Sequence, residues 1–358
     1  MRKAVVIFIS VFLFFVLTIV VTTPNFFPFL FQLTFNRDIK LQQVDSRINI
    51  LLLGTSGLNH EGPNLTDTII FAGVDPLKKN VTLTSIPRDL WIPDLNGKIN
   101  TAYSKGEEKR KGGGLILSKK VVSKILNQPI QYGIRGNFEA FVKAVDLIGG
   151  LDLYVDRSFD DYEYPIEGKE NDLCGHKEDE IPVLATASSQ LEAFPCRYTL
   201  VRFDGGLSNL DGKRALEFVR SRHALGPEGT DFARSRRQEK VISAFKNKVF
   251  TIQTLANPAK VISLYNILRA NIDTDIPQGE FDDFVRLLNK IKDAKTRSAV
   301  LDFGDNQEGR PGILMHPDIT SEYNFEWVLI PKKGNGNFSE IQDYIACEIK
   351  IGDCIIPN

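Results

Sequence analysis

The sequence has almost no net charge. It contains 44 lysine and arginine residues against 45 aspartate and glutamate residues, which leaves a formal net charge of −1. Proteins that bind nucleic acids usually carry a broad positive field, so this balance argues against a nucleic-acid partner. Any cluster of arginines in the chain must therefore act locally, on one anion at one site.

Histidine and cysteine are also scarce, with four of each. The histidines are scattered along the chain, at positions 60, 176, 223 and 316, and no cysteine pair has C-x-x-C spacing. A zinc site is therefore not expected. The cysteines instead form two local pairs, Cys174 with Cys196 and Cys347 with Cys354, which predict two disulfides and an oxidising compartment. Four buried, reduced thiols are the alternative.

Long uncharged apolar sequence occurs once, near the N-terminus. Arg2 and Lys3 precede an apolar run over residues 4–21, and no further charged residue occurs before Arg37. A run of this length predicts one transmembrane helix, and the positive-inside rule places everything after about residue 36 outside the cell membrane. A cleaved signal peptide is the alternative, but the run is long and no A-x-A site follows it. We expect residues 1–36 to form a cytoplasmic stub, a single-pass anchor and an interfacial segment.

Short apolar runs alternate with helical patterns from residue 48 onward. The runs at 48–54, 68–74 and 81–86 predict buried strands, as do 129–134 and 151–155, whereas 114–126 and 137–147 have helical periodicity. This alternation predicts an α/β fold with a central sheet that is covered on both faces. We expect one domain over 37–250, with 156–202 as a disulfide-bracketed insertion. Residues 251–358 should add helices at 257–272 and 281–294 and strands at 298–303 and 326–331, packed on that domain.

Arginines gather in a single stretch of the chain, "FVRSRHALGPEGTDFARSRRQEK", which spans residues 218–240. We expect Asp211 to cap a short helix over 213–218, after which Arg220 and Arg222 share one face of an extended segment. Asp231 should cap a second helix, on which Arg234, Arg237 and Gln238 share a face, whereas Arg236 points elsewhere. A solvated basic helix face is the alternative. Further upstream, Asp67 and Arg88 stand at the ends of neighbouring predicted strands, where a site above the sheet edge would form.

Six motifs in these regions resemble the successive motifs of the LytR-CpsA-Psr proteins. They are "LLLG", "LTDT", "SIPRD", "KINTAY", "LDGKRALEFVRSRH" and "DFARSRRQ", and their order agrees over about residues 48–248. The resemblance implies a three-layer α/β/α sandwich with a central mixed sheet. It also implies an extracytoplasmic transferase that moves a glycopolymer phosphate from a polyprenyl diphosphate carrier to a cell-wall acceptor, usually peptidoglycan.

The resemblance assigns roles to individual residues. Asp67 matches a metal-binding acid for Mg²⁺. The diphosphate-binding set comprises Arg88, Arg220, Arg222, Arg234 and Gln238, and of these Arg88 and Arg220 are also expected to act in catalysis. Guanidinium groups and a divalent cation suit this chemistry, because phosphoryl transfer depends mainly on positioning and on neutralising the phosphate oxygens.

Two positions leave alternatives open. Asp89 would either orient or deprotonate the attacking hydroxyl, as a third catalytic residue, or anchor an arginine by an ion pair. The family commonly has a second acid directly after the glycine of the first strand, but this chain has Thr55 and Ser56 there. Glu61, in the following loop, is one substitute as a metal ligand, and a looser Mg²⁺ shell completed by hydroxyl groups and waters is the alternative.

Two rival functions use the same arginines. A polyprenyl-diphosphate hydrolase would use water as the acceptor, in a water-filled site that is open near the metal. A non-catalytic binder of anionic wall polymers would have an exposed basic groove without a lipid pocket. The transferase predicts a deep apolar pocket that ends at Arg88 and Arg220.

Overall fold

The computed structural model describes residues 39–57, 62–169, 171–177, 189–249, 263, 266–267, 271–305, 310–352 and 354–356. The predicted transmembrane helix at 4–21 and most of the predicted helix at 257–272 lie outside these residues. Within the described part of the chain, no helix combines the length and the apolar character needed to cross a membrane.

A six-stranded mixed sheet forms the centre of the molecule. Its strand order is β11-β6-β1-β2-β3-β12, in which β6 runs parallel to β1 and β12 parallel to β3, while the other neighbours are antiparallel. The strands are β1 (Ile48–Thr55), β2 (Thr66–Asp75), β3 (Asn80–Ser85), β6 (Tyr132–Asn137), β11 (Ile272–Thr274) and β12 (Lys295–Val300). The expected α/β fold with a mixed central sheet is therefore confirmed.

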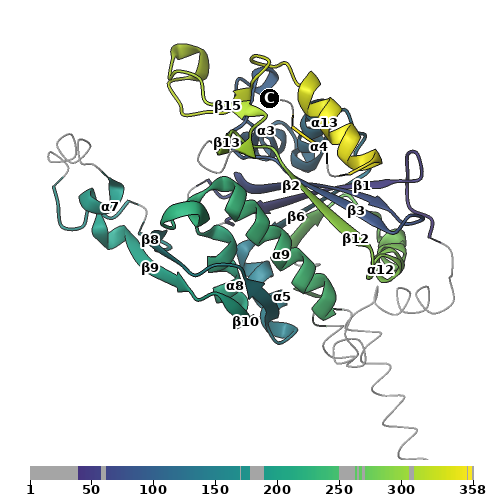
Figure 1. The fold of residues 1–358 in the computed structure, drawn as a ribbon, viewed down its shortest axis with the longest axis horizontal. Helices are drawn as coiled ribbons and strands as arrows, with labels where there is room; N and C mark the ends of the chain where they lie inside the picture. The colour runs from purple at the N-terminus through teal and green to yellow at the C-terminus, as the bar shows by residue number, and fades with distance from the viewer. Residues whose placement is uncertain are drawn as a thin grey trace, which may run out of the picture.

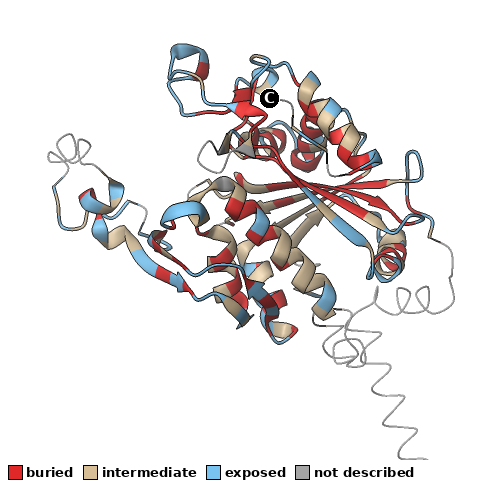
Figure 2. Ribbon diagram, viewed as in Figure 1, coloured by how far each residue is buried: buried red, intermediate tan, exposed pale blue. Residues whose placement is uncertain are grey.

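Apolar side chains cover both faces of this sheet, because successive residues of a strand point to opposite sides. Leu51 and Leu53 pack on one face, and Ile48 and Ile50 pack on the other. Figure 2 shows the central strands largely in the colour of buried residues. The uninterrupted apolar run of β1 is thus explained by burial on two sides.

Helices lie on both sides of the sheet (Figure 1). One side carries α3 (Ala102–Lys109), α4 (Gly113–Leu126) and α13 (Ser339–Lys350). The other side carries α5 (Phe138–Leu147), α8 (Gly212–Arg220), α9 (Asp231–Val249) and α12 (Phe281–Lys290). The boundary that we expected at residue 250 stays a prediction, and β11 and β12, which follow it, are strands of the central sheet.

Two small antiparallel sheets extend the α5–α8–α9 side. β7 (Leu151–Val155) pairs with β10 (Gly206–Leu210), and β8 (Phe159–Pro165) pairs with β9 (Tyr198–Phe203). The β8–β9 hairpin projects away from the central sheet and carries α7 (Gln190–Ala193) (Figure 1). Its base is anchored in a cluster of phenylalanines, in which Phe203 lies 5.1 Å from Phe218 between ring centroids.

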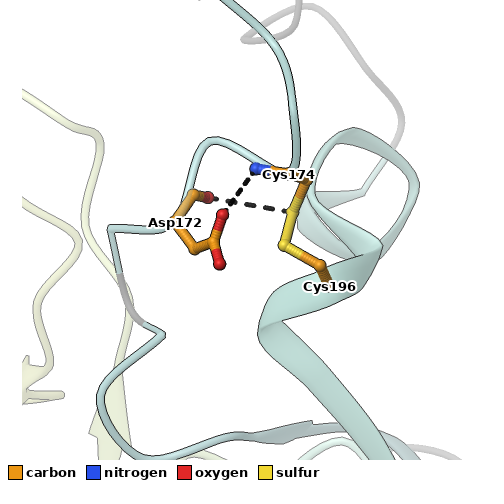
Figure 3. Close-up of side chains that lie close together, drawn as sticks. All are labelled: Asp172, Cys174 and Cys196. Atoms are coloured by element: carbon orange, nitrogen blue, oxygen red, sulfur yellow. Dashed lines mark hydrogen bonds between the residues drawn. A yellow bond between two sulfur atoms is a disulfide. The ribbon is translucent and has the colours of Figure 1, made fainter.

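Both predicted disulfides are present. Cys174 is bonded to Cys196 inside the hairpin, and Cys347 of α13 is bonded to Cys354, which follows the helix. Asp172 lies against the first disulfide and accepts a hydrogen bond from the Cys174 amide at 2.9 Å (Figure 3). Asp172, Cys174 and Cys196 lie close together, but both sulfur atoms belong to the disulfide, so these three residues do not form a metal site.

Several expectations about local structure were wrong in detail. Helix α8 continues to Arg220, so the strand that we expected over 219–222 is absent from this described segment. Asp211 does cap α8, accepting a hydrogen bond from the Arg214 amide, but at α9 it is the Thr230 hydroxyl that accepts from the amide of Ala233. The expected strand at 326–331 shrinks to β16 (Ile330–Pro331), and α13 was not foreseen.

The remaining strands have two residues each and form tight local pairs. They are β4 (Trp91–Ile92) with β5 (Gly97–Lys98), β13 (Gly304–Asp305) with β14 (Arg310–Pro311), and β15 (Leu314–Met315) with β16.

Candidate active site

A cavity of about 250 Å³ lies where the start of β2, the end of α8, the first half of α9 and the β8–β9 hairpin meet. Six of the residues predicted from sequence line it together. These are Asp67, Arg88, Arg220, Arg222, Arg234 and Gln238. Residues that are up to 171 positions apart in the sequence therefore converge on one polar cavity.

Asp67 and Arg88 form the sheet side of this cavity. They meet because β2 and β3 are antiparallel, so that the start of β2 lies beside the segment that follows β3. The Arg88 Nη1 donates to the Asp67 Oδ1 at 2.5 Å, and the side chains keep 31% and 35% of their surface exposed. Both groups therefore remain within reach of a ligand in the cavity.

Asp89 lies behind the arginines. It is buried, and its carboxylate forms ion pairs with three cations, at 3.4 Å from Arg88, 3.2 Å from Lys98 and 3.9 Å from Arg222. Lys98 in turn lies 3.2 Å from Glu326. Asp89 does not belong to the described residues that line the cavity. These contacts favour an anchoring role for Asp89 over contact with an attacking hydroxyl.

Arg220 and Arg222 reach the cavity in a different way from the one we expected. Arg220 is the last residue of α8, and Ser221 then adopts an extended ψ of 128°, which keeps the two arginines on one side of the chain. The Arg220 guanidinium lies 4.6 Å from the centroid of the Phe138 ring and 5.5 Å from that of Tyr164. Burial raises the pKa of the Tyr164 phenol, and the nearby guanidinium partly opposes this shift.

The segment that carries these arginines is held by a buried acid that the sequence analysis did not single out. The Asp161 Oδ2 accepts hydrogen bonds from the Ser221 hydroxyl at 2.5 Å, from the Arg222 amide at 3.0 Å and from the His223 amide at 3.3 Å. Asp161 is 1% exposed. One signal was available in the sequence: in β8, Asp161 falls on the same face as the buried Phe159, where an acid requires a partner.

Helix α9 divides its basic residues between two sides. Arg234 and Gln238 are buried and line the cavity, and the Gln238 amide donates to the Thr68 hydroxyl at 3.2 Å. Arg236 points elsewhere, as expected, and pairs with Asp156 at 3.4 Å beside a second cavity of about 170 Å³.

Arg237 does not join the first cavity, which contradicts our expectation. Its guanidinium donates to the carbonyl oxygens of Phe218 and Ser221, at 2.9 Å and 2.7 Å, and pairs with Glu228 at 2.8 Å. Burial lowers the pKa of this guanidinium, and Glu228 opposes the shift. Arg237 therefore ties α9 to the end of α8, as a structural residue.

Asp67 is the carboxylate of the cavity that could hold a magnesium ion together with a phosphate ligand. Mg²⁺ is typically held by one or two carboxylates together with substrate phosphates and waters, so Asp67 can suffice as the protein carboxylate on the sheet side. Thr55 stands where the family commonly has an acid, and it is buried. Glu61, the tentative substitute, lies outside the described residues.

Comparisons with known proteins agree with the family resemblance of the motifs that line the cavity. The family model named LytR_cpsA_psr matches residues 32–310, which is more than half of the chain. The chain belongs to the LytR_cpsA_psr family.

Curated relatives that match this chain are named polyisoprenyl-teichoic acid–peptidoglycan teichoic acid transferase TagU, and two of them illustrate the match. The protein of Oceanobacillus iheyensis is 26% identical over 290 residues, which cover 80% of this chain and 75% of the relative. The protein of Bacillus cereus is 28% identical over 240 residues, which cover 66% of this chain and 62% of the relative.

Solved structures show the same fold. TagV of Bacillus subtilis has a TM-score of 0.53 at 22% identity, over 86% of this chain and 98% of that protein. A structure described as TagT bound to LI-WTA has a TM-score of 0.52 at 18% identity, over 87% of this chain and 94% of that protein.

Proposed function

We propose that this LytR_cpsA_psr protein transfers a glycopolymer phosphate from a polyprenyl diphosphate carrier to a cell-wall acceptor such as peptidoglycan. The single observation that carries the proposal is the convergence of four arginines and Asp67 on one cavity. The TagU relatives are named as teichoic acid transferases. These names support a wall polymer as the transferred group, with teichoic acid as the first candidate.

The arrangement suits transfer at a diphosphate because the guanidinium groups surround it from several sides. Arg88 and Arg220 approach from the sheet and from the end of α8, and they stabilise the charge that develops on the transferred phosphate. Arg222, Arg234 and Gln238 bind the diphosphate and fix its orientation. Asp89 holds Arg88 and Arg222 in place from behind.

Asp67 would hold Mg²⁺ together with the donor's phosphate oxygens. The ion would supply further neutralisation of the phosphate charge. Glu61 would be the second protein ligand in this proposal.

The protein would act at the outer surface of the cell membrane. Residues 1–36 would anchor it there, which keeps the domain close to a lipid-linked donor. In our proposal residues 37–250 form the catalytic domain, with 156–202 as its insertion, and residues 251–358 pack on it. The deep apolar pocket expected for the lipid also stays a prediction, since the apolar lining of the described cavity is limited to Phe138, Pro165, Val219 and the Tyr198 ring.

The test compares Arg220, which ends α8 and lines the cavity, with Arg236 of α9, which does not line it. Arg220→Ala should lower the transfer rate by about 100-fold or more, because it removes a donor aimed at the reacting phosphate. Arg236→Ala, which changes the same residue type outside the cavity, should keep its activity. Arg220→Lys should restore the rate only in part, since an ammonium group cannot make the two-pronged contact of a guanidinium.

The measurements are release of polyprenyl phosphate and appearance of glycan on peptidoglycan fragments, first with Mg²⁺ and then with a chelator. Equal loss in the Arg220→Ala and Arg236→Ala proteins, or full activity in both, would contradict the single-site proposal. Release of polyprenyl phosphate without glycan on the acceptor would indicate the hydrolase, and glycan binding without release would indicate a binder.

A further inference from the structure

His223 and Glu163 are two of the titratable side chains that line the cavity without a role in the proposed function. His223 follows the second cavity arginine of the Arg220–Arg222 segment, and Glu163 faces it from β8. The His223 Nδ1 lies 3.9 Å from the Glu163 Oε2, and the side chains are 57% and 28% exposed. The carboxylate therefore lies on the Nδ1 side of the ring. A neutral ring whose proton is on Nδ1 would accept a proton at Nε2.

The backbones of both residues are fixed by the same buried acid. The Asp161 Oδ2 accepts from the His223 amide at 3.3 Å, and the Asp161 Oδ1 accepts from the Glu163 amide at 3.0 Å. A β-bridge between Asp161 and Ala224 joins the two segments. The pair is therefore held at the cavity by the fold itself, on the same support as the arginines.

A transferase needs a proton acceptor for the attacking hydroxyl. Asp89 is poorly placed for this task, because three cations surround it and it lies outside the cavity lining. Asp67 is engaged by Arg88. Imidazole is the side chain that takes up and releases a proton most readily near neutral pH, and a carboxylate beside it is the usual means of orienting it.

We infer that His223 is the general base of the transfer reaction and that Glu163 orients it; this inference rests on the proposed function. The proton of the acceptor hydroxyl passes to the His223 Nε2 as the hydroxyl oxygen bonds to the phosphorus next to the glycan. The bond from that phosphorus to the bridging oxygen breaks, and its electron pair leaves with polyprenyl phosphate. No oxidant, reductant or further reactant is needed.

The neighbours of His223 in the cavity carry charges of both signs. The charged and titratable groups that share the cavity with His223 are Asp67, Arg88, Asp161, Glu163, Tyr198, Arg220, Arg222 and Arg234. Of these, Glu163 is the acid that pairs with the ring.

The experiment measures single-turnover transfer against pH, using the full chain in detergent, a short polyprenyl diphosphate disaccharide as donor and peptidoglycan fragments as acceptor. The wild-type rate should fall towards acid pH as the imidazole takes up a proton. His223→Gln should lower the rate by about 100-fold or more and abolish this acid limb. Added imidazole should partly restore His223→Ala. His176→Ala, outside the cavity, should behave as wild type.

Glu163→Gln distinguishes catalysis from folding. Without the carboxylate the ring loses the group that orients it, so the transfer rate should fall while the unfolding temperature changes little. A wild-type rate and an unchanged acid limb in both His223→Gln and Glu163→Gln would overturn the inference and leave the proposed function standing. Absence of transfer by the wild-type protein would instead contradict the proposed function.

Discussion

Replacing Asp161 should uncouple the arginine segment from the hairpin that supports it. The carboxylate accepts four hydrogen bonds, from the Ser221 hydroxyl and from the amides of Arg222, His223 and Glu163. An asparagine keeps one acceptor oxygen, whose best position is that of Oδ2. Its amino group then faces the Glu163 N–H, and the three remaining bonds lose their charge assistance.

The size of the effect follows from these contacts. A hydrogen bond to a charged group contributes about 1.5–3 kcal/mol and one between neutral groups about 0.5–1.5 kcal/mol, so Asp161→Asn should lower the free energy of unfolding by about 2–3 kcal/mol. Asp161→Ala leaves all four donors without this acceptor and should cost about 4 kcal/mol or more. The transfer rate should fall further than the loss of folded protein explains, because Arg222 and His223 lose their support.

Urea unfolding and single-turnover transfer measure the two effects separately. Asp160→Asn is the matched control, because Asp160 precedes Asp161 on the same strand but pairs at the surface with Arg202, at 2.7 Å. This control should leave stability and transfer close to wild type. If Asp161→Asn were as stable and as active as Asp160→Asn, the view that a buried carboxylate positions the arginines would be wrong.

Three further predictions concern single side chains. Burial raises the pKa of the Glu239 carboxyl on α9 to about 7. A hydrogen bond with Ser298 and the charge of Arg236 partly oppose this rise. The folded state then holds this proton more tightly, so the free energy of unfolding should fall by at most about 3 kcal/mol as the pH rises from about 4.5 to about 7, and Glu239→Gln should remove this slope in urea titrations. Arg237→Met should lower the free energy of unfolding by about 3–5 kcal/mol because it leaves Glu228 without its partner, whereas Arg236→Ala should change it by less than about 0.5 kcal/mol. Asp67→Asn should abolish the Mg²⁺ dependence of transfer yet retain binding of a polyprenyl diphosphate, as measured by fluorescence titration; undiminished Mg²⁺-dependent transfer would contradict the metal assignment.

Strands β1, β2 and β3 of the central sheet could be predicted because they are buried on both faces. β1, β2 and β3 appear in the sequence as apolar runs without a helical period, and two-sided burial leaves no other position for such runs in a folded domain. Helices α4 and α5 could be predicted for the complementary reason, since each has one apolar face. In these elements the hydrophobic pattern of the local sequence matches the burial that the tertiary structure imposes.

The environment of the arginines could not be predicted in the same way. Arg234 and Arg237 stand three residues apart on one helix, yet Arg234 lines the cavity and Arg237 turns to the carbonyl groups at the end of α8. What separates them is the position of α8, which depends on packing between distant segments. Asp161 was missed for a related reason, because three of its four hydrogen-bond donors lie 60 to 62 residues away.

Charge balance in the cavity gives an electrostatic reason for a divalent cation. Four arginines and three carboxylates line the described cavity, which leaves a net charge of +1 when His223 is neutral. A diphosphate that is esterified at both ends carries a negative charge on each phosphate, so the side chains alone do not neutralise it. Asp67 increases this deficit of positive charge on the sheet side, because it neutralises part of the charge of Arg88. A cation held by Asp67 would reverse this effect, since it would satisfy the carboxylate and release Arg88 to the phosphate oxygens.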